Sequence, residues 1–101
     1  MPVLRKDLDI SVASSTVWFD VRDIASGCIE ARRRSDDWTA GILEVWQSQT
    51  PGGGIDTGLR LGPGNDMTDP IDFQFAYVGV RVSSTVEAAS ETVDIFLHPK
   101  A

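Results

Sequence analysis

The sequence predicts an all-β protein, an antiparallel β-sandwich of jelly-roll or Greek-key type with seven or eight short strands. The first observation is the alternation of apolar and polar residues in short runs rich in valine and isoleucine, which is typical of half-buried strands. The second is the spacing of turn residues, at intervals of roughly 8–15 residues, as expected for a sandwich. The third is that no segment keeps a helical period over the ~10 residues that an ordinary helix needs.

The clearest strands lie in residues 77–97. Aliphatic residues occupy every second position of each half: Val78, Val80 and Val82 in the first, and Val93, Ile95 and Leu97 in the second. Two such strands are not stable alone in water, so other strands must cover their aliphatic face. The apolar residues shift from odd-numbered to even-numbered positions between Tyr77 and Val78, which predicts a bulge or a tight corner at that point.

The remaining strands are predicted by the same alternation. In chain order they cover residues 7–12, 16–21, 28–34, 42–48, 57–61 and 73–75. A flexible arm, residues 1–6, precedes the first of them and carries Arg5. The glycine-rich segments 51–54 and 62–64 break regular structure and separate strands. The chain has a common domain size and no linker, so residues 1–101 are expected to form a single domain.

The charge and the cysteine content exclude several kinds of protein. The net charge is −6, which argues against nucleic acid or an anionic membrane as partner, because these need clustered lysine and arginine. The only cysteine, Cys28, excludes an intramolecular disulfide and is expected to be a small buried hydrophobic residue. The first residues lack the apolar region of a signal peptide, and no apolar run reaches transmembrane length. We therefore expect a soluble protein made in a cytoplasm.

The residues give almost no support for catalysis. The only histidine, His98, is followed by Pro99 at a chain end that is expected to fray, and no histidine is expected near Cys28. No serine lies in a G-x-S-x-G turn, and no pair of carboxylates stands out for glycoside hydrolysis. The sequence therefore predicts a protein that is not an enzyme and has no cofactor.

One loop contains a possible set of metal ligands, Asp66, Asp69 and Asp72. Carboxylate oxygens bind calcium, but the spacing differs from the D-x-D-x-D-G pattern that makes such a loop specific. Aspartate is also frequent in loops because its side chain caps turns. We predict no metal site, and calcium binding by this loop stays an open alternative.

Large aromatic residues provide the best candidate site. Four of them lie on the face opposite the aliphatic residues of their own strands: Trp18, Trp46, Tyr77 and Phe96. A small sandwich usually has polar residues there, and exposed tryptophan and tyrosine are typical anchors of protein interfaces. The alternative is that a loop or the N-terminal arm covers them within the monomer.

The basic run Arg32, Arg33 and Arg34 is unusual in an acidic chain. Arginine forks bind carboxylates in a bidentate manner, so the run is a candidate docking point for an acidic neighbour, and Arg5 of the arm could reach a neighbour too. The alternative is a solvated strand end that Glu30 or the following aspartates neutralise, since exposed ion pairs are common and weak.

Two segments resemble small β-sandwich virion proteins of tailed bacteriophages. Residues 38–48 (W-T-A-G-I-L-E-V-W-Q-S) precede a glycine-rich turn, and residues 77–82 (Y-V-G-V-R-V) lead into the final strand. These correspond to the family's strand with a terminal serine before a glycine loop and to its Y-V-R-V-x-V strand, with Gly79 inserted here. The family's S-x-D-G loop signature is absent, because residues 48–52 contain no aspartate.

The resemblance implies a capsid decoration (cement) protein on the virion surface that binds the major capsid protein and self-associates as a dimer or trimer. The short chain without a second domain favours a free-standing subunit of this kind. The alternative is a carbohydrate- or protein-binding module of a phage tail or fibre, in which Trp18 or Trp38 would stack on a pyranose ring. A hydrolase is the third alternative.

Overall fold

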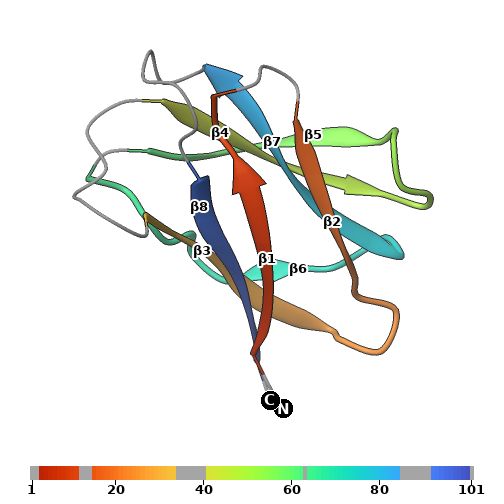
Figure 1. Ribbon diagram of the computed structural model, residues 1–101. Coiled ribbons are helices and arrows are strands. Elements are labelled where there is room, and N and C mark those ends of the chain that lie inside the picture. Colours follow the sequence, from red (N-terminus) through yellow and green to blue (C-terminus); the bar gives the residue numbers. More distant parts are fainter. Residues whose placement is uncertain (1–2, 12–14, 34–40, 63, 85–91, 101) are drawn as a thin grey trace.

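The computed structural model describes residues 3–11, 15–33, 41–62, 64–84 and 92–100. It confirms the predicted fold class, because eight antiparallel strands form two sheets and the described residues contain no helix. The strands are β1 (Leu4–Asp9), β2 (Thr16–Asp20), β3 (Ser26–Arg33), β4 (Ile42–Ser48), β5 (Ile55–Leu61), β6 (Ile71–Asp72), β7 (Tyr77–Ser84) and β8 (Thr92–Pro99) (Figure 1).

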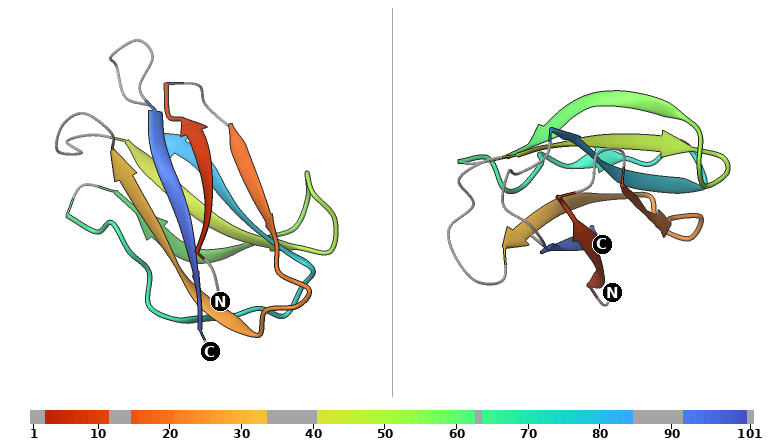
Figure 2. Two further views of the ribbon diagram at one scale, coloured as in Figure 1. Left: turned by 60° about the horizontal axis from the view of Figure 1, so that its bottom comes forward. Right: turned by 45° about the horizontal axis from the view of Figure 1, so that its top comes forward.

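The strand order is that of a jelly roll. One four-stranded sheet has the order β1-β8-β3-β6, and the other has the order β2-β7-β4-β5. The chain crosses from one sheet to the other at each connection except the β4–β5 hairpin, which leaves two layers packed face to face. Figure 2 shows β4, β5 and β7 in one layer and β1, β3 and β8 in the other.

The core lies between the sheets and consists of the aliphatic positions that the alternation predicts. Six alternating residues of β7 and β8 are fully or almost fully buried: Val78, Val80, Val82, Val93, Ile95 and Leu97. Phe19 of β2, Ile29 of β3 and Leu43 of β4 join them in one cluster. Each such side chain stabilises the fold by about 1.5–3 kcal/mol through burial, before the cost of conformational entropy. Because these buried residues alternate along each strand, the residues between them lie on the outer faces of the sandwich.

The N-terminal arm was predicted wrongly, because β1 begins at Leu4 and pairs with β8 along its whole length. Leu4 lies opposite Leu97 and packs against the core, which anchors this end of the chain. Lys6 occupies an inward position near the edge of the sandwich. Its ammonium group donates a hydrogen bond to the carbonyl of Trp18 and lies 5.7 Å from the centre of the Phe19 ring. A lysine can hold this position because its stem covers apolar surface while its charged end finds a carbonyl.

Two further expectations differ from the structure. The corner predicted at Tyr77 lies just before it, because residues 73–76 connect β6 to β7 and β7 pairs with β2 without a register shift from Tyr77 to Arg81. Phe73 and Phe75 therefore belong to this connection instead of a strand. Cys28 is partly exposed, because it lies on the outer side of β3 between the inward positions Gly27 and Ile29.

Candidate functional site

The residues predicted to contact a partner are divided between two opposite outer faces of the sandwich. On sheet β1-β8-β3-β6 these are Arg5, Arg32 and Phe96. On sheet β2-β7-β4-β5 they are Trp18, Trp46 and Tyr77. The side chain of Arg33 and the whole of Arg34 lie outside the described residues. Two separate surfaces therefore need to be considered.

The first surface, which we call the arginine face, consists of Arg5, Glu30, Arg32, Asp94, Phe96 and His98. Phe96 lies near its centre, between Arg5 on β1 and Glu30 on β3. The guanidinium of Arg32 lies 4.9 Å from the centre of the Phe96 ring, and the rings of Phe96 and His98 are stacked at a centroid distance of 6.1 Å. A cation over an aromatic face is attracted by the ring quadrupole.

Two ion pairs of the arginine face place a carboxylate below an arginine. Arg5 contacts Asp94 at 2.9 Å, and Arg32 contacts Glu30 at 2.9 Å. The carboxylate side chains are only 13% and 11% exposed, whereas the arginine side chains are 52% and 63% exposed. A partner that approaches this face therefore meets the two guanidinium groups, the aromatic ring and the carboxylate of Asp7, which is 58% exposed and lies 3.5 Å from Arg5, whereas Glu30 and Asp94 lie beneath.

Glu30 is the centre of this network, and the sequence did not single it out. Its Oε1 lies 2.7 Å from Nε2 of His98, and its Oε2 accepts from Arg32. Burial raises the pKa of Glu30, but the hydrogen bonds from Arg32 and His98 outweigh burial and hold the pKa below its usual range. The carboxylate is therefore kept ionised beneath Arg32 and His98.

His98 lies in a strand, so the expectation of a fraying end was wrong. Strand β8 pairs with β3 as far as Pro99, and Cys28 lies directly opposite His98. The expectation that no histidine lies near Cys28 was therefore wrong as well. Since Nε2 of His98 contacts Glu30, the histidine serves the ion-pair network of the arginine face.

The second surface, which we call the tryptophan face, consists of Thr16, Trp18, Trp46, residues 52–54, Gly79 and Arg81. Gly79 of β7 lies between Trp18 of β2 and Trp46 of β4 in the strand register. A Cβ atom on Gly79 would lie 2.6, 2.6 and 2.9 Å from three adjacent atoms of the Trp18 ring. Distances this similar require the face of the six-membered ring to lie over Gly79. The Trp18 ring therefore lies flat against the sheet, because Gly79 has no side chain at that point.

Neighbouring side chains hold Trp46 in place. Its Nε1 donates a hydrogen bond to Glu44 at 3.2 Å, and the Arg81 guanidinium lies 5.5 Å from its ring centre. Tyr77 lies further along β7, opposite Asp20 and outside this cluster. The two tryptophans and the arginine thus form one preorganised group.

A cavity of about 370 Å³ lies on the tryptophan face. Its lining consists of Thr16, Trp18, Trp46, Gly52, Gly53, Gly54 and Arg81. The three glycines belong to the β4–β5 turn, which closes one side. Gly54 has a φ of 111°, and a Cβ there would lie 2.2 Å from the carbonyl oxygen of Gln47, so only glycine fits this turn. An isolated glycine within a valine-rich strand, Gly79, is the sequence signal that could have located this site.

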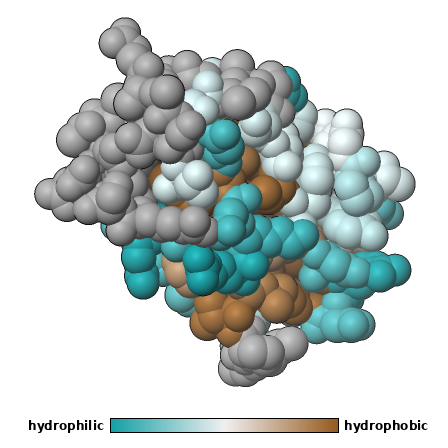
Figure 3. All heavy atoms as spheres, viewed as in Figure 1, coloured by the Kyte–Doolittle hydropathy of each residue, from teal (hydrophilic) through white to brown (hydrophobic). Residues whose placement is uncertain are grey.

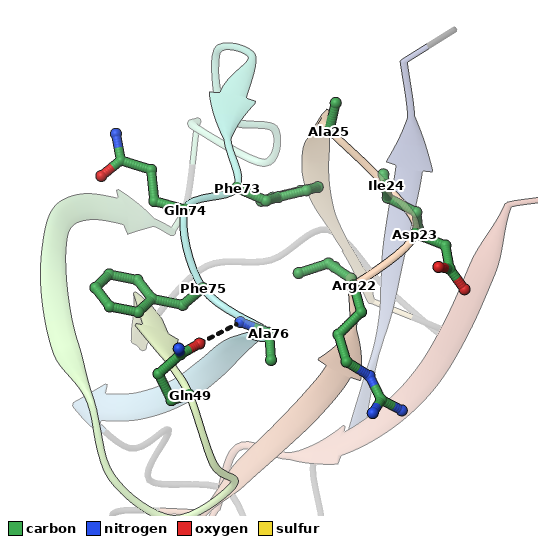
Figure 4. Close-up of a pocket in the computed structure, with 10 residues that line it drawn as sticks. Arg22, Asp23, Ile24, Ala25, Gln49, Phe73, Gln74, Phe75 and Ala76 are labelled. Atoms are coloured by element: carbon green, nitrogen blue, oxygen red, sulfur yellow. Dashed lines mark hydrogen bonds between the residues drawn. The ribbon is translucent and has the colours of Figure 1, made fainter.

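A second cavity, of about 570 Å³, lies at one end of the sandwich between residues 21–25 and 73–76. Figure 4 shows the Phe73 ring pointing across it toward Ile24, whereas Gln74 points away. The side-chain oxygen of Gln49 accepts a hydrogen bond from the Ala76 amide at 3.0 Å. These contacts join the two connections to each other and to Gln49, the residue that follows β4, so we assign the cavity to the packing of the loops.

Exposed apolar residues do not by themselves single out a site. The most exposed large ones come from four separate segments: Val3, Ile42, Ile55 and Met67. Figure 3 shows a hydrophobic area below a band of hydrophilic residues on the side that it presents. The two faces are defined instead by the pairing of arginine with aromatic rings.

The structure describes all three aspartates of the candidate calcium loop but does not gather them. Within the described residues, no group of three His, Cys, Asp or Glu side chains could hold a metal ion. The loop runs along β3, where the Ala31 amide donates to the carbonyl of Asp66 and the Ile29 amide donates to the hydroxyl of Thr68. Because this segment pairs with β3, Asp66, Asp69 and Asp72 are spread along the edge of sheet β1-β8-β3-β6.

Comparison with known proteins assigns the chain to no family. The sequence matches no known protein-family model, and it matches no curated protein at a significant level. In the described part of the chain, no helix is long and apolar enough to cross a membrane.

Proposed function

We propose that this protein is a non-enzymatic virion component that decorates and stabilises a capsid shell, docking through its arginine face. The jelly-roll fold and the resemblance of residues 38–48 and 77–82 to phage virion proteins support the proposal. The observation that carries it is the arginine face itself, where Arg5 and Arg32 are far more exposed than the Asp94 and Glu30 carboxylates they contact and Arg32 lies over the Phe96 ring.

The arginine face defines the chemistry of the partner surface. Arginine and aromatic residues are enriched at the centres of protein interfaces, where an arginine fork can bind a carboxylate through two hydrogen bonds. An acidic patch on the major capsid protein fits this face. The chain as a whole carries a net charge of −6, so its other surfaces are repelled by such a patch. The two exposed guanidinium groups therefore favour docking through this face at short range, beside the carboxylates of Asp7, Asp94 and Glu30 that they contact.

Docking of this kind stabilises the shell by mass action. The acidic patches of adjacent capsid subunits are held at fixed spacing only in the assembled shell, so a dimer or trimer of this protein binds several of them at once there. A ligand that binds only the assembled state shifts the equilibrium toward that state. Self-association and docking would thus together make the protein a cement.

The test is co-sedimentation of the purified protein with phage shells from which it has been stripped, with light scattering for its own oligomeric state. We expect saturable binding at a fixed copy number per shell that weakens as the salt concentration rises. Arg32→Gln should weaken binding about tenfold or more, which corresponds to about 1.4 kcal/mol.

Arg22→Gln is the matched control. Arg22 is 65% exposed and paired with Asp20, much as Arg32 is 63% exposed and paired with Glu30, but it lies outside the arginine face. Its binding to shells should equal that of the unmodified protein. A wild-type protein that stays in the supernatant would refute the proposed function, and equal losses in the two variants would refute the arginine face as the docking surface.

A further inference from the structure

We infer that the tryptophan face is a saccharide-binding site that takes a pyranose ring against Trp18. This goes beyond decoration of a shell, because it is a second binding activity on the opposite side of the sandwich. A subunit that docks through the arginine face leaves the tryptophan face exposed to solvent.

The flat indole supplies the apolar half of the recognition. One face of the six-membered ring of Trp18 lies on Gly79, so its other face points away from the sheet. A pyranose ring has a face of C–H groups that packs on an aromatic plane of this kind, where burial of apolar area and contact with the π-electrons both favour binding. Trp46, on the other side of Gly79, extends the aromatic surface.

Polar groups around the same cavity supply the other half. Sugar hydroxyls both donate and accept hydrogen bonds, and the lining offers the Thr16 hydroxyl, the Arg81 guanidinium and the backbone of residues 52–54. A guanidinium has five N–H donors, so Arg81 can bind a hydroxyl while it keeps the contacts that position it. The cavity therefore combines an aromatic plane for the C–H face of a sugar with polar groups for its hydroxyls.

The size and rigidity of the site favour a saccharide over a peptide. A volume of about 370 Å³ lies at the lower end of the range for small-ligand pockets and suits about one or two ring units. The β4–β5 turn closes one side of the cavity, whereas a proline-rich peptide needs a groove that continues in both directions. Trp18 is fixed by Gly79, and Trp46 is fixed by Glu44 and Arg81, so little side-chain freedom is lost on binding.

The test uses the full chain on an array of neutral, amino and acidic pyranose oligosaccharides, followed by calorimetric titration of the strongest hit. We expect binding that quenches tryptophan fluorescence and weakens at least tenfold in Trp18→Ala. Trp18→Tyr, which keeps an aromatic plane, should retain more of the affinity than Trp18→Ala. Thermal unfolding of each variant verifies that the loss comes from the site and not from the fold.

Arg32→Gln separates this inference from the proposed function. It should lose shell binding and keep saccharide binding, while Trp18→Ala should show the reverse. Absence of binding across the array would overturn the saccharide site and leave shell docking unaffected. Binding of a proline-rich peptide at the tryptophan face, with no saccharide binding, would overturn it too and assign the surface to protein recognition.

Discussion

Replacing Gly79 by alanine tests the central geometry of the tryptophan face. The new methyl group would lie 2.6 Å from two carbon atoms of the Trp18 ring, whereas carbon atoms in favourable contact are about 3.5–4.0 Å apart. The ring must therefore retreat by about 1 Å or leave the sheet. We expect Gly79→Ala to destabilise the protein, because the ring must give up its present position over the glycine.

Two opposing effects determine how much Gly79→Ala changes the free energy of unfolding. Forcing an extra methyl group into a packed site costs about 1–3 kcal/mol. Replacing glycine by alanine also removes freedom from the unfolded chain, which stabilises by about 0.4–1 kcal/mol. The two ranges leave a net loss of unfolding free energy of about 0–2.6 kcal/mol, with a midpoint of about 1.3 kcal/mol. For a domain of this size each kcal/mol corresponds to about 4–8 °C in the midpoint of thermal unfolding.

The assay is urea unfolding followed by tryptophan fluorescence, with Gly53→Ala as the matched control. A Cβ on Gly53 would find its nearest atom, the Ser48 hydroxyl oxygen, at 3.9 Å, so this variant should stay within about 0.5 kcal/mol of the original. In a Trp18→Ala background the clash is gone, and Gly79→Ala should become neutral or stabilising. Equal effects of Gly79→Ala with and without Trp18 would refute the packing of the ring on the glycine.

Two further predictions concern buried polar groups. Glu30 has a lowered pKa in the folded state, so its contribution to stability is present above about pH 4.5, the ordinary value, and is lost as the pH falls through the folded pKa. Glu30→Gln should therefore lose stability relative to the original at pH 7 and much less at pH 3 in urea titrations, and a difference independent of pH would contradict the ion-pair network with Arg32 and His98. Thr68→Val removes the hydroxyl that accepts from the Ile29 amide at 3.0 Å, so it should destabilise by about 1–3 kcal/mol in thermal melts, while Thr68→Ser should restore most of the loss. Equal stability of the two Thr68 variants would show that this hydrogen bond is not needed.

The fold class could be predicted from the sequence because alternation in a strand is a local property. A period of two assigns each residue to one side of its strand, and the buried side must be aliphatic. The same rule placed Trp18, Trp46 and Phe96 on outer faces before any strand was paired. The ends of strands were less certain, as the arm around Arg5 shows, because pairing with β8 extends β1 beyond its own alternating residues.

The sites, in contrast, depend on which strands become neighbours. Glu30 and His98 are distant in sequence, and so are Trp18 and Gly79, yet strand order and register bring each pair into contact. Alternation excludes a register shift by one residue, but it does not fix strand order or shifts by two residues, which result from the closure of long loops and the joint packing of both sheets. The side of its strand that a residue takes is thus a local property that alternation predicts, whereas the residues that become its neighbours on that side depend on the folding of the whole chain.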